Sequence, residues 1–485
     1  MQIEKLSTEQ RYALEKFKNG ENLFITGPGG TGKTTLIKNI IDVATSLKKK
    51  TQVCALTGCA AVLLNCSAKT IHSWSGIRIA RGDSKKIIDS VLKSGKLKKA
   101  WKKIDVLIVD EVSMMSLKIF EILDEIGKHI RYSPKPFGGI QVIFTGDFFQ
   151  LPPVGTYGEP ETEAFCFESL KWFQIFKLEN HIELKTIFRQ NDKIYIDILS
   201  EIRKGELSEN NIEILKKYLN REYEKITPTK IFPIRSKVDY VNTTMFDKLD
   251  EDEYQFEYTI KTDCKTILDT GKGFSLEQSI RCEKMTNQEK EYEMENLSNN
   301  TPCEKILKLK KGASVLCRVN IDMDNGICNG SQGIVTNIIE KSDLLIEVKF
   351  SNGITKIIEP HYWQSEEYPC IAIKQYPLCL AWAMTIHKIQ GATLDMAEID
   401  IGSSVFEYGQ TYVALSRVKS LYGLYLSAFA PEKIHANPKV IEFYNNIPQI
   451  DLPLIQVEIK NPFKEYELKE ESFIENNSNI KIIKI

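Results

Sequence analysis

The chain has 485 residues, of which 42% are hydrophobic and 27% charged, with a formal net charge of −1. These proportions are typical of globular proteins, and the length allows about three domains, each with its own core. No apolar run reaches the ~18 residues needed to cross a bilayer, so no membrane partner is expected. A net charge near zero does not by itself indicate a nucleic-acid partner.

The N-terminus and the cysteines indicate the compartment. Residues 1–6 lack the apolar core of a signal peptide, and Glu4 and Glu9 are not typical of a transit peptide. The eleven cysteines include no C-x-x-C pair, so neither a zinc ribbon nor a disulfide framework is expected. We expect an intracellular protein with reduced thiols, in the nucleus or the cytoplasm according to its source.

A phosphate-binding motif follows the first strand-like run. Residues 23–26 are strand-like, residues 27–35 read GPGGTGKTT, and residues 36–41 are helix-like. This order fits the pattern G-x-x-x-x-G-K-[ST], in which backbone N–H groups and a helix N-terminus bind phosphates. The alternative, a glycine-rich turn with a chance lysine, would not require a strand before the loop and a helix after it. Residues 27–35, which we call the phosphate loop, therefore predict nucleoside triphosphate binding, with Lys33 on the β- and γ-phosphates and Thr34 on Mg²⁺. The predicted contacts are Gly27, Gly29, Gly30, Thr31, Gly32, Lys33, Thr34 and Thr35.

A basic run lies between residues 81 and 103. It contains nine Lys or Arg against two acids. Such a run can bind a phosphate backbone, although a solvated helical face is the usual cause of a charge run, and both interpretations stay open here. The candidates for contact with a phosphate backbone are Lys96, Lys98 and Lys99, which we call the lysine triplet.

Two further strand-like runs end in polar residues. The run at 106–109 ends in Asp110 and Glu111, and the run at 141–145 leads to Gln150. Functional groups of a doubly wound α/β domain lie at the carboxyl ends of its strands, so these side chains are expected to face the phosphate loop. Asp110 can bind Mg²⁺, Glu111 can take a proton from the attacking water, and Gln150 can sense the γ-phosphate.

Two later arginines can supply cations to the γ-phosphate from a second domain. They are Arg189 and Arg417. Each alone is also compatible with a structural ion pair. The predicted catalytic residues are Lys33, Asp110, Glu111, Gln150, Arg189 and Arg417.

Taken in order, these motifs resemble those of the Pif family of DNA helicases, in the RecD-like branch of superfamily one. The resemblance covers about residues 5 to 430. The matching segments are 6–10, 27–35, 55–61, 70–74, 110–114, 146–154, 188–190, 385–394 and 412–418.

The resemblance implies an α/β fold with two RecA-like P-loop motor domains, each a parallel sheet with helices on both faces. The first would span residues 1–180 with a small basic insertion at 76–103. The second would span 181–440 with an SH3-like β-barrel insertion at about 309–378, and 441–485 would be a peripheral tail. Residues 251–300 match least, and we expect a loop or helical insert there.

The resemblance also implies site residues. Gln10 would read the adenine, Gly391 would also contact the nucleotide, and the DNA backbone contacts would be Thr57, His72, His387 and Lys388. His72 has the alternative of a hydrogen-bonded loop histidine. Trp74 is more typical of a core residue than of a base-stacking platform.

The implied activity is that of an ATP-dependent, Mg²⁺-requiring DNA helicase. It would move 5′→3′ on single-stranded DNA and unwind duplex or forked DNA in replication, repair, recombination or telomere maintenance. RNA–DNA hybrids and G-quadruplex DNA are further candidate substrates, and the free protein is expected to be a monomer. One alternative is a DNA-stimulated ATPase that remodels complexes without separating strands. A second is a nucleotide-switched binding module, which the set Glu111, Gln150, Arg189 and Arg417 disfavours.

Overall fold

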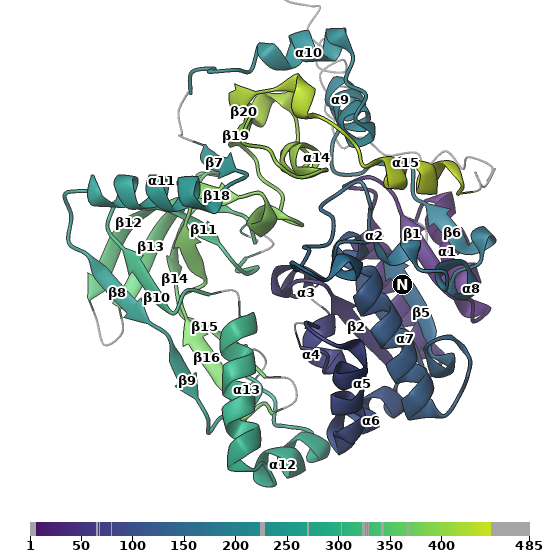
Figure 1. Ribbon diagram of the computed structural model, residues 1–485. Helices are drawn as coiled ribbons and strands as arrows, with labels where there is room; N and C mark the ends of the chain where they lie inside the picture. Colours follow the sequence, from purple (N-terminus) through teal and green to yellow (C-terminus); the bar gives the residue numbers. More distant parts are fainter. Residues whose placement is uncertain are drawn as a thin grey trace, which may run out of the picture.

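The computed structural model describes residues 6–447, apart from residues 65, 67, 79, 224–227, 269–270, 302, 323–324, 326, 328, 341–343 and 366–367. Two parallel sheets and a group of antiparallel strands organise this part of the chain (Figure 1). The two parallel sheets with flanking helices confirm the predicted α/β class.

The first α/β domain is built on a six-stranded parallel sheet with strand order β3-β2-β4-β5-β1-β6. Adjacent residues of β4 face opposite sides, so Leu107 and Val109 enter one core while Val106 and Ile108 enter the other. A strand buried on both faces is apolar throughout, which is why this run does not alternate. The strands are β1 (Leu23–Thr26), β2 (Thr51–Ala55), β3 (Lys69–Thr70), β4 (Val106–Asp110), β5 (Gln141–Thr145) and β6 (His181–Glu183).

Helices cover both faces of this sheet. Helices α1 (Thr8–Lys18) and α2 (Lys33–Ser46) pack on one face, and α7 (Leu117–Arg131) packs on the other. The remaining helical segments of the domain are α3 (Gly58–Leu64), α4 (Ile71–Ser75), α5 (Ser84–Lys93), α6 (Gly95–Lys103), η2 (Val112–Met114), η3 (Pro136–Gly139), η4 (Pro160–Thr162), η5 (Cys166–Glu168), α8 (Trp172–Ile175) and η6 (Leu178–Asn180).

The second α/β domain is built on a four-stranded parallel sheet with strand order β18-β7-β19-β20. Its strands are β7 (Thr229–Phe232), β18 (Ala383–Thr385), β19 (Ala397–Ile401) and β20 (Leu424–Phe429). Its helical segments are α9 (Lys193–Lys204), α10 (Glu209–Lys216), α11 (Arg235–Asp247), η7 (His387–Ile389), α14 (Gln410–Leu415), η8 (Leu421–Gly423) and η9 (Pro431–Lys433). No helix in the described part of the chain combines the length and the apolar character that crossing a membrane demands.

An antiparallel region is inserted between β7 and β18. Five strands form one sheet with its own apolar core, in the order β14-β13-β12-β11-β17. They are β11 (Ser314–Cys317), β12 (Gln332–Glu340), β13 (Leu344–Phe350), β14 (Thr355–Ile358) and β17 (Leu378–Leu380). An antiparallel insertion therefore lies at the predicted place, whereas its assignment as an SH3-like barrel stays a prediction.

The segment at 251–300 contains both strands and helices. Strand β8 (Tyr254–Glu257) pairs with β10 (Ile306–Leu309), and β9 (Thr259–Lys261) pairs with β16 (Ala372–Gln375), which also pairs with β15 (His361–Gln364). Helices α12 (Leu276–Glu283) and α13 (Asn287–Asn300) follow. The expected helical insert is present, and the two short strands tie it to the antiparallel region.

The prediction of a peripheral tail from residue 441 is wrong for residues 441–447. Helix α15 (Pro438–Asn445) inserts Val440 and Phe443 into the core of the first α/β domain. The apolar i, i+3 pair provides the packing face, and Asn437 caps the helix by accepting the N–H of Lys439. The rest of the predicted tail, residues 448–485, lies outside the described residues.

Candidate active site

A cavity of about 300 Å³ lies between the two α/β domains. Most of its walls come from the phosphate loop, from the ends of β4 and β5, and from residues of the second domain. All six residues predicted to be catalytic line it, namely Lys33, Asp110, Glu111, Gln150, Arg189 and Arg417. Gly391 lines it too.

The phosphate loop needs glycine for steric reasons. Gly27 and Gly30 have positive φ angles of 137° and 87°. A Cβ atom on Gly27 would lie 2.4 Å from the carbonyl oxygen of Leu184, and one on Gly30 would lie 2.6 Å from Cβ of Arg189. Only glycine allows both this backbone conformation and such a close approach by the segment that follows β6.

Lys33 begins α2 and points back over the loop. Its ammonium group donates hydrogen bonds to the carbonyl oxygens of Gly27 (2.6 Å) and Pro28 (3.0 Å). Burial lowers the pKa of Lys33, and the negative charges of Asp147, Glu111 and Asp110 act in the opposite direction. The lysine is thus a half-buried group held at the centre of the loop.

Two carboxylates follow β4. Asp110 accepts hydrogen bonds from the hydroxyl of Thr145 and from the N–H of Glu111 (2.9 Å), which fix its orientation. Burial raises the pKa of Asp110. Asp110 and Thr34 place two oxygen donors on one cavity, the hard ligand type that Mg²⁺ prefers, so this donor set fits the metal.

Glu111 has an unusual backbone and an unusual charge environment. Its φ and ψ of 55° and 43° lie in the left-handed region, where a non-glycine residue is strained. Burial raises its pKa to about 6, the neighbouring Asp110 adds to the rise, and Lys33 and Arg417 oppose it. The side-chain amide of Gln390 donates to Oε2 of Glu111 (3.3 Å). A carboxyl group with a raised pKa is suited to accept a proton near neutral pH.

Gln150 is buried where the chain leaves β5. Its side-chain oxygen Oε1 has no hydrogen-bond partner among the described residues, although the side chain lines the cavity. A buried polar atom of this kind is costly unless a ligand or water satisfies it. This orphaned oxygen supports a polar ligand in the cavity.

The two arginines meet at Ser416. The Arg189 guanidinium donates to the Ser416 carbonyl oxygen (3.2 Å), and that of Arg417 donates to the Ser416 hydroxyl (2.7 Å) and the Val413 carbonyl oxygen (2.9 Å). Neither forms a salt bridge with a residue that the structure describes. Burial lowers the pKa of Arg189, and burial together with Arg189 lowers that of Arg417 to about 10. A half-buried and a buried cation, neither in a salt bridge with a described carboxylate, favour a polyanionic ligand over the alternative of structural ion pairs.

Three predicted nucleotide contacts, Gln10, Gly27 and Thr35, do not line this cavity. The side-chain amide of Gln10 donates to the carbonyl oxygens of Thr31 (3.2 Å) and Gly32 (3.3 Å). Its oxygen accepts the N–H of Ser7 (3.0 Å) in the capping box of α1. Gln10 therefore uses its side-chain amide to hold the backbone of the phosphate loop against α1.

Three polar residues that were not predicted from the sequence make long-range contacts around the cleft. The Tyr412 hydroxyl accepts the N–H of Gly29 (2.8 Å), and the Gln190 amide donates to the carbonyl oxygens of Ser416 (3.3 Å) and Val418 (3.4 Å). The third is Gln390, which contacts Glu111. Tyr412, Gln190 and Gln390 all lie inside recognised motifs, but nothing in the sequence pairs them with partners more than 200 positions away.

The predicted DNA contacts lie on several elements outside the cavity. The Thr57 hydroxyl accepts the N–H of Ala60 (3.2 Å) at the start of α3, and His387 and Lys388 are exposed on η7. His72 lies half-buried on α4, a helix rather than a loop, and burial lowers its pKa. Trp74 is a core residue, 7% exposed, with its ring 4.7 Å from that of Trp101.

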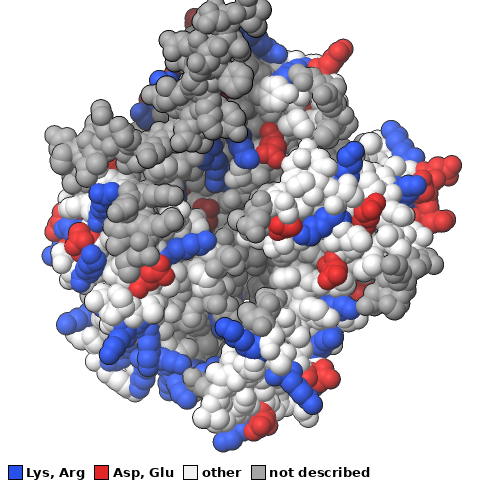
Figure 2. Space-filling view, turned by 180° about the vertical axis from the view of Figure 1, so that it is seen from behind, with Lys and Arg blue, Asp and Glu red and all other residues white. Residues whose placement is uncertain are grey.

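The lysine triplet lies on α6. Lys99 is exposed, whereas the ammonium group of Lys96 lies 4.8 Å from the ring centroid of Tyr368 in the antiparallel region. Seen from behind, Lys and Arg side chains gather at the lower left, on the side of the first α/β domain (Figure 2). This side of the molecule is thus basic, and one member of the triplet also contacts the inserted region.

Two parallel-sheet domains, a phosphate loop, a carboxylate pair and two arginines around one cavity define a P-loop protein of the two-domain motor class. Comparison with known proteins identifies the family within this class. Residues 5–213 match the model of the PIF1-like helicase family, and residues 293–338 match the model of the DNA helicase Pif1 2B domain. The chain belongs to the PIF1-like helicase family.

Relatives and solved structures agree with this assignment. The ATP-dependent DNA helicase PIF1 of Xenopus laevis is 34% identical over 447 residues, which cover 91% of this chain and 64% of that protein. The crystal structure of the Pif1 helicase from Candida albicans is 31% identical with a TM-score of 0.70, covering 92% of this chain and 100% of that chain. A Bacteroides Pif1 helicase in complex with ADP-AlF3 and single-stranded DNA is 28% identical with a TM-score of 0.59, covering 91% and 96%. The chain spans about 64% of the length of the PIF1 relatives from Xenopus laevis and Danio rerio.

Proposed function

We propose that this chain is an ATP-dependent DNA helicase that moves 5′→3′ on single-stranded DNA and unwinds duplex or forked DNA. The observation that carries the proposal is the pair of arginines, half-buried Arg189 and buried Arg417, on the cavity that is also lined by Lys33 and Glu111. Cations on both sides of one cleft suit a nucleoside triphosphate, whose γ-phosphate is the part that hydrolysis removes.

The proposed roles follow from position and charge. Glu111 takes a proton from the attacking water, and Gln150 orients that water through its buried amide. Thr34 and Asp110 would hold Mg²⁺, which when bound neutralises phosphate charge. Lys33 and the two arginines stabilise the negative charge that develops on the transferred phosphoryl group.

Movement on DNA follows from opening and closing of the cleft. ATP attracts Arg189 and Arg417 towards the phosphate loop, and hydrolysis removes that attraction. Thr57 and His72 on the first domain, with His387 and Lys388 on the second, would hold the DNA backbone alternately. Contacts of this kind do not read base edges, so tracking is independent of sequence.

The remaining parts of the proposal concern partners and context. Beyond forked and duplex DNA, RNA–DNA hybrids and G-quadruplex DNA are candidate substrates, and the antiparallel region is proposed to be an SH3-like domain. The protein is proposed to act as an intracellular monomer when free of DNA, in replication, repair, recombination or telomere maintenance.

The proposal is tested by ATP hydrolysis with and without a single-stranded oligonucleotide. We expect strong stimulation by the oligonucleotide, near-complete loss in Glu111→Gln, and no loss in Glu161→Gln, whose carboxylate is exposed on η4. Absence of DNA stimulation in the unchanged chain would refute the proposal. Stimulated hydrolysis without strand separation would instead indicate the remodelling translocase.

A further inference from the structure

A buried polar network joins three neighbouring strand ends to two helices that lie outside the recognised motifs. Its members are Asp147 after β5, Arg203 on α9 and Tyr444 on α15, with Thr26 at the end of β1 and Glu183 at the end of β6. In sheet order these strands are β5-β1-β6, so the network spans the edge of the sheet from which the phosphate loop emerges.

An ion pair anchors the network. Asp147 is fully buried and Arg203 is 7% exposed. Nε of Arg203 lies 3.0 Å from Oδ2 of Asp147, and Nη2 lies 3.0 Å from Oδ1, a two-pronged arrangement. Arg203 belongs to α9, whose Ile198 and Ile202 lie in the core of the second α/β domain. The pair therefore links the second domain to the turn of the first that carries Gln150.

The Tyr444 hydroxyl is fully used. It donates to Oδ1 of Asp147 (3.3 Å), accepts the N–H of Phe148 (3.1 Å), and lies 2.5 Å from Oγ1 of Thr26. A tyrosine hydroxyl offers one donor and two acceptor positions, so the Thr26 hydroxyl must be the donor in the third bond. Thr26 directly precedes the phosphate loop, and Phe148 lies two residues before Gln150. One hydroxyl group therefore holds both the entry to the phosphate loop and the Gln150 turn.

The segment that leads into α15, the helix that carries Tyr444, crosses between the domains. Ile434 packs in the core of the second domain and Ala436 packs against that of the first, so the chain crosses within two residues. A Cβ atom on Gly205, at the end of α9, would lie 2.4 Å from the backbone N of Ala436. The crossing segment and α9 thus lie in close contact.

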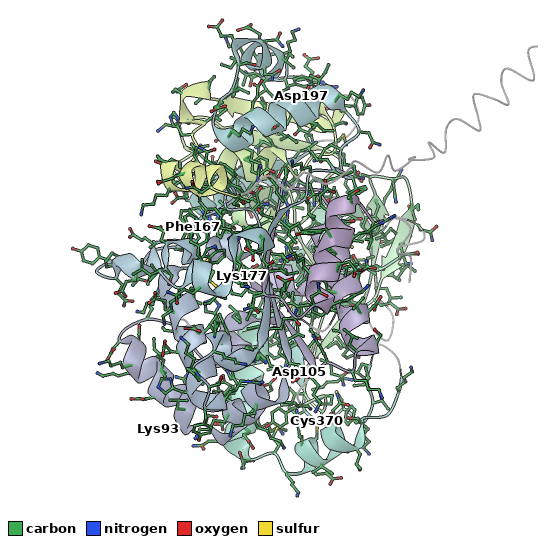
Figure 3. All side chains as sticks on the ribbon, turned by 90° about the vertical axis from the view of Figure 1, so that its right-hand side faces the viewer. Lys93, Asp105, Phe167, Lys177, Asp197 and Cys370 are labelled. Atoms are coloured by element: carbon green, nitrogen blue, oxygen red, sulfur yellow. The ribbon has the colours of Figure 1, made fainter. Side chains whose placement is uncertain are left out.

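The figures show the same placement. Helix α15 lies along the edge of the first domain that faces α9 (Figure 1), and in the side view it lies beside Phe167 (Figure 3). The Phe443 ring stacks on that of Phe167 with centroids 4.3 Å apart, and the Tyr444 ring stacks on Phe149 at 4.7 Å. Tyr444 is therefore fixed by its ring as well as by its hydroxyl.

We propose that Tyr444 is a positioning residue for ATP hydrolysis, with the Asp147–Arg203 pair as its anchor. Its hydroxyl keeps the phosphate loop and the Gln150 turn in fixed register with each other and with the second α/β domain. Closure of the cleft then brings the arginines onto a loop that is already in its hydrolytic geometry. This inference rests on the proposed function, because it assigns a role in the same hydrolysis reaction.

The test removes the hydrogen bond between Thr26 and Tyr444 from either end. Tyr444→Phe keeps the stacked ring and loses only the hydroxyl, and Thr26→Val keeps the shape of Thr26 and loses its hydroxyl. The control is Tyr157→Phe, at a fully exposed tyrosine of the first domain. For each variant and for the double variant, kcat and KM for ATP are measured with saturating single-stranded DNA, and the thermal midpoint is recorded.

We expect Tyr444→Phe to lower kcat by about threefold to tenfold, which corresponds to the net free energy of about one hydrogen bond, with KM for ATP changed less than about twofold. Thr26→Val should lower kcat similarly, and the double variant should be no slower than the slower single variant, because both remove the same bond. If Tyr444→Phe does not fold, Thr26→Val carries the test alone.

An unchanged kcat in a folded Tyr444→Phe or Thr26→Val variant would overturn the inference. Multiplied losses in the double variant, or a loss confined to KM, would overturn it as well, because a shared positioning bond predicts neither. No turnover by the unchanged chain would refute the proposed function, and the inference with it, whereas turnover in the unchanged chain with no effect of the variants refutes the inference alone.

Discussion

Replacing Glu111 by glutamine separates the cost of burying this carboxylate from its use in hydrolysis. The pKa of Glu111 is raised from 4.5 to about 6, chiefly by burial and then by Asp110. At about 1.4 kcal/mol per pKa unit, the ionised carboxylate costs the folded state about 2 kcal/mol. Because the pKa is higher in the folded state, the folded state binds more protons between pH 4.5 and 6. The contribution of Glu111 to the unfolding free energy therefore falls as pH rises through this window.

Glutamine keeps the shape of Glu111 and cannot ionise. We expect Glu111→Gln to be more stable than the unchanged chain by about 2 kcal/mol at pH 8 and equally stable at pH 4, while losing DNA-stimulated ATP hydrolysis. Urea unfolding at the two pH values, with ATP turnover measured in parallel, checks both parts. A stability difference that does not depend on pH would refute the burial argument, and normal turnover would remove Glu111 as the base.

Three further variants test other parts of the site. Lys33→Ala should abolish ATP hydrolysis because it removes the cation of the phosphate loop, and substantial turnover would refute that assignment. Gly409→Ala places a Cβ atom 2.5 Å from the Phe149 carbonyl oxygen at a φ of 74°, so it should lower the thermal midpoint and turnover. The control is Gly20→Ala, which has a φ of 81° and open space around it; equal effects of the two variants would contradict the clash. Changing the three lysines of the triplet to glutamine should reduce the slope of log binding constant against log salt concentration, measured for single-stranded DNA, by up to about two. An unchanged slope would indicate that these lysines only form a solvated face of α6.

Local sequence patterns predicted most of the first-domain residues that line the cavity. The phosphate loop and Asp110 follow runs that are apolar throughout because both faces of the sheet are buried. Such strands are visible in sequence, and the carboxyl end of each parallel strand falls on the same sheet edge. The order of short motifs alone therefore placed Lys33, Asp110 and Gln150 around one cavity.

Contacts between distant segments could not be predicted in the same way. Tyr444 lies 418 positions from Thr26, on a short helix with one apolar pair and no motif. Its role depends on where the chain crosses between the domains, and no local pattern records that crossing. The same holds for Lys96, whose charge was visible in the sequence while its contact with Tyr368 was not.

The most direct test of the proposed function is unwinding of two forked duplexes, one with a 5′ single-stranded tail and one with a 3′ tail, in the presence of Mg²⁺ and ATP. The account predicts that only the 5′-tailed duplex opens and that Glu111→Gln opens neither. Opening of the 3′-tailed duplex alone, or of neither substrate by the unchanged chain, would contradict it.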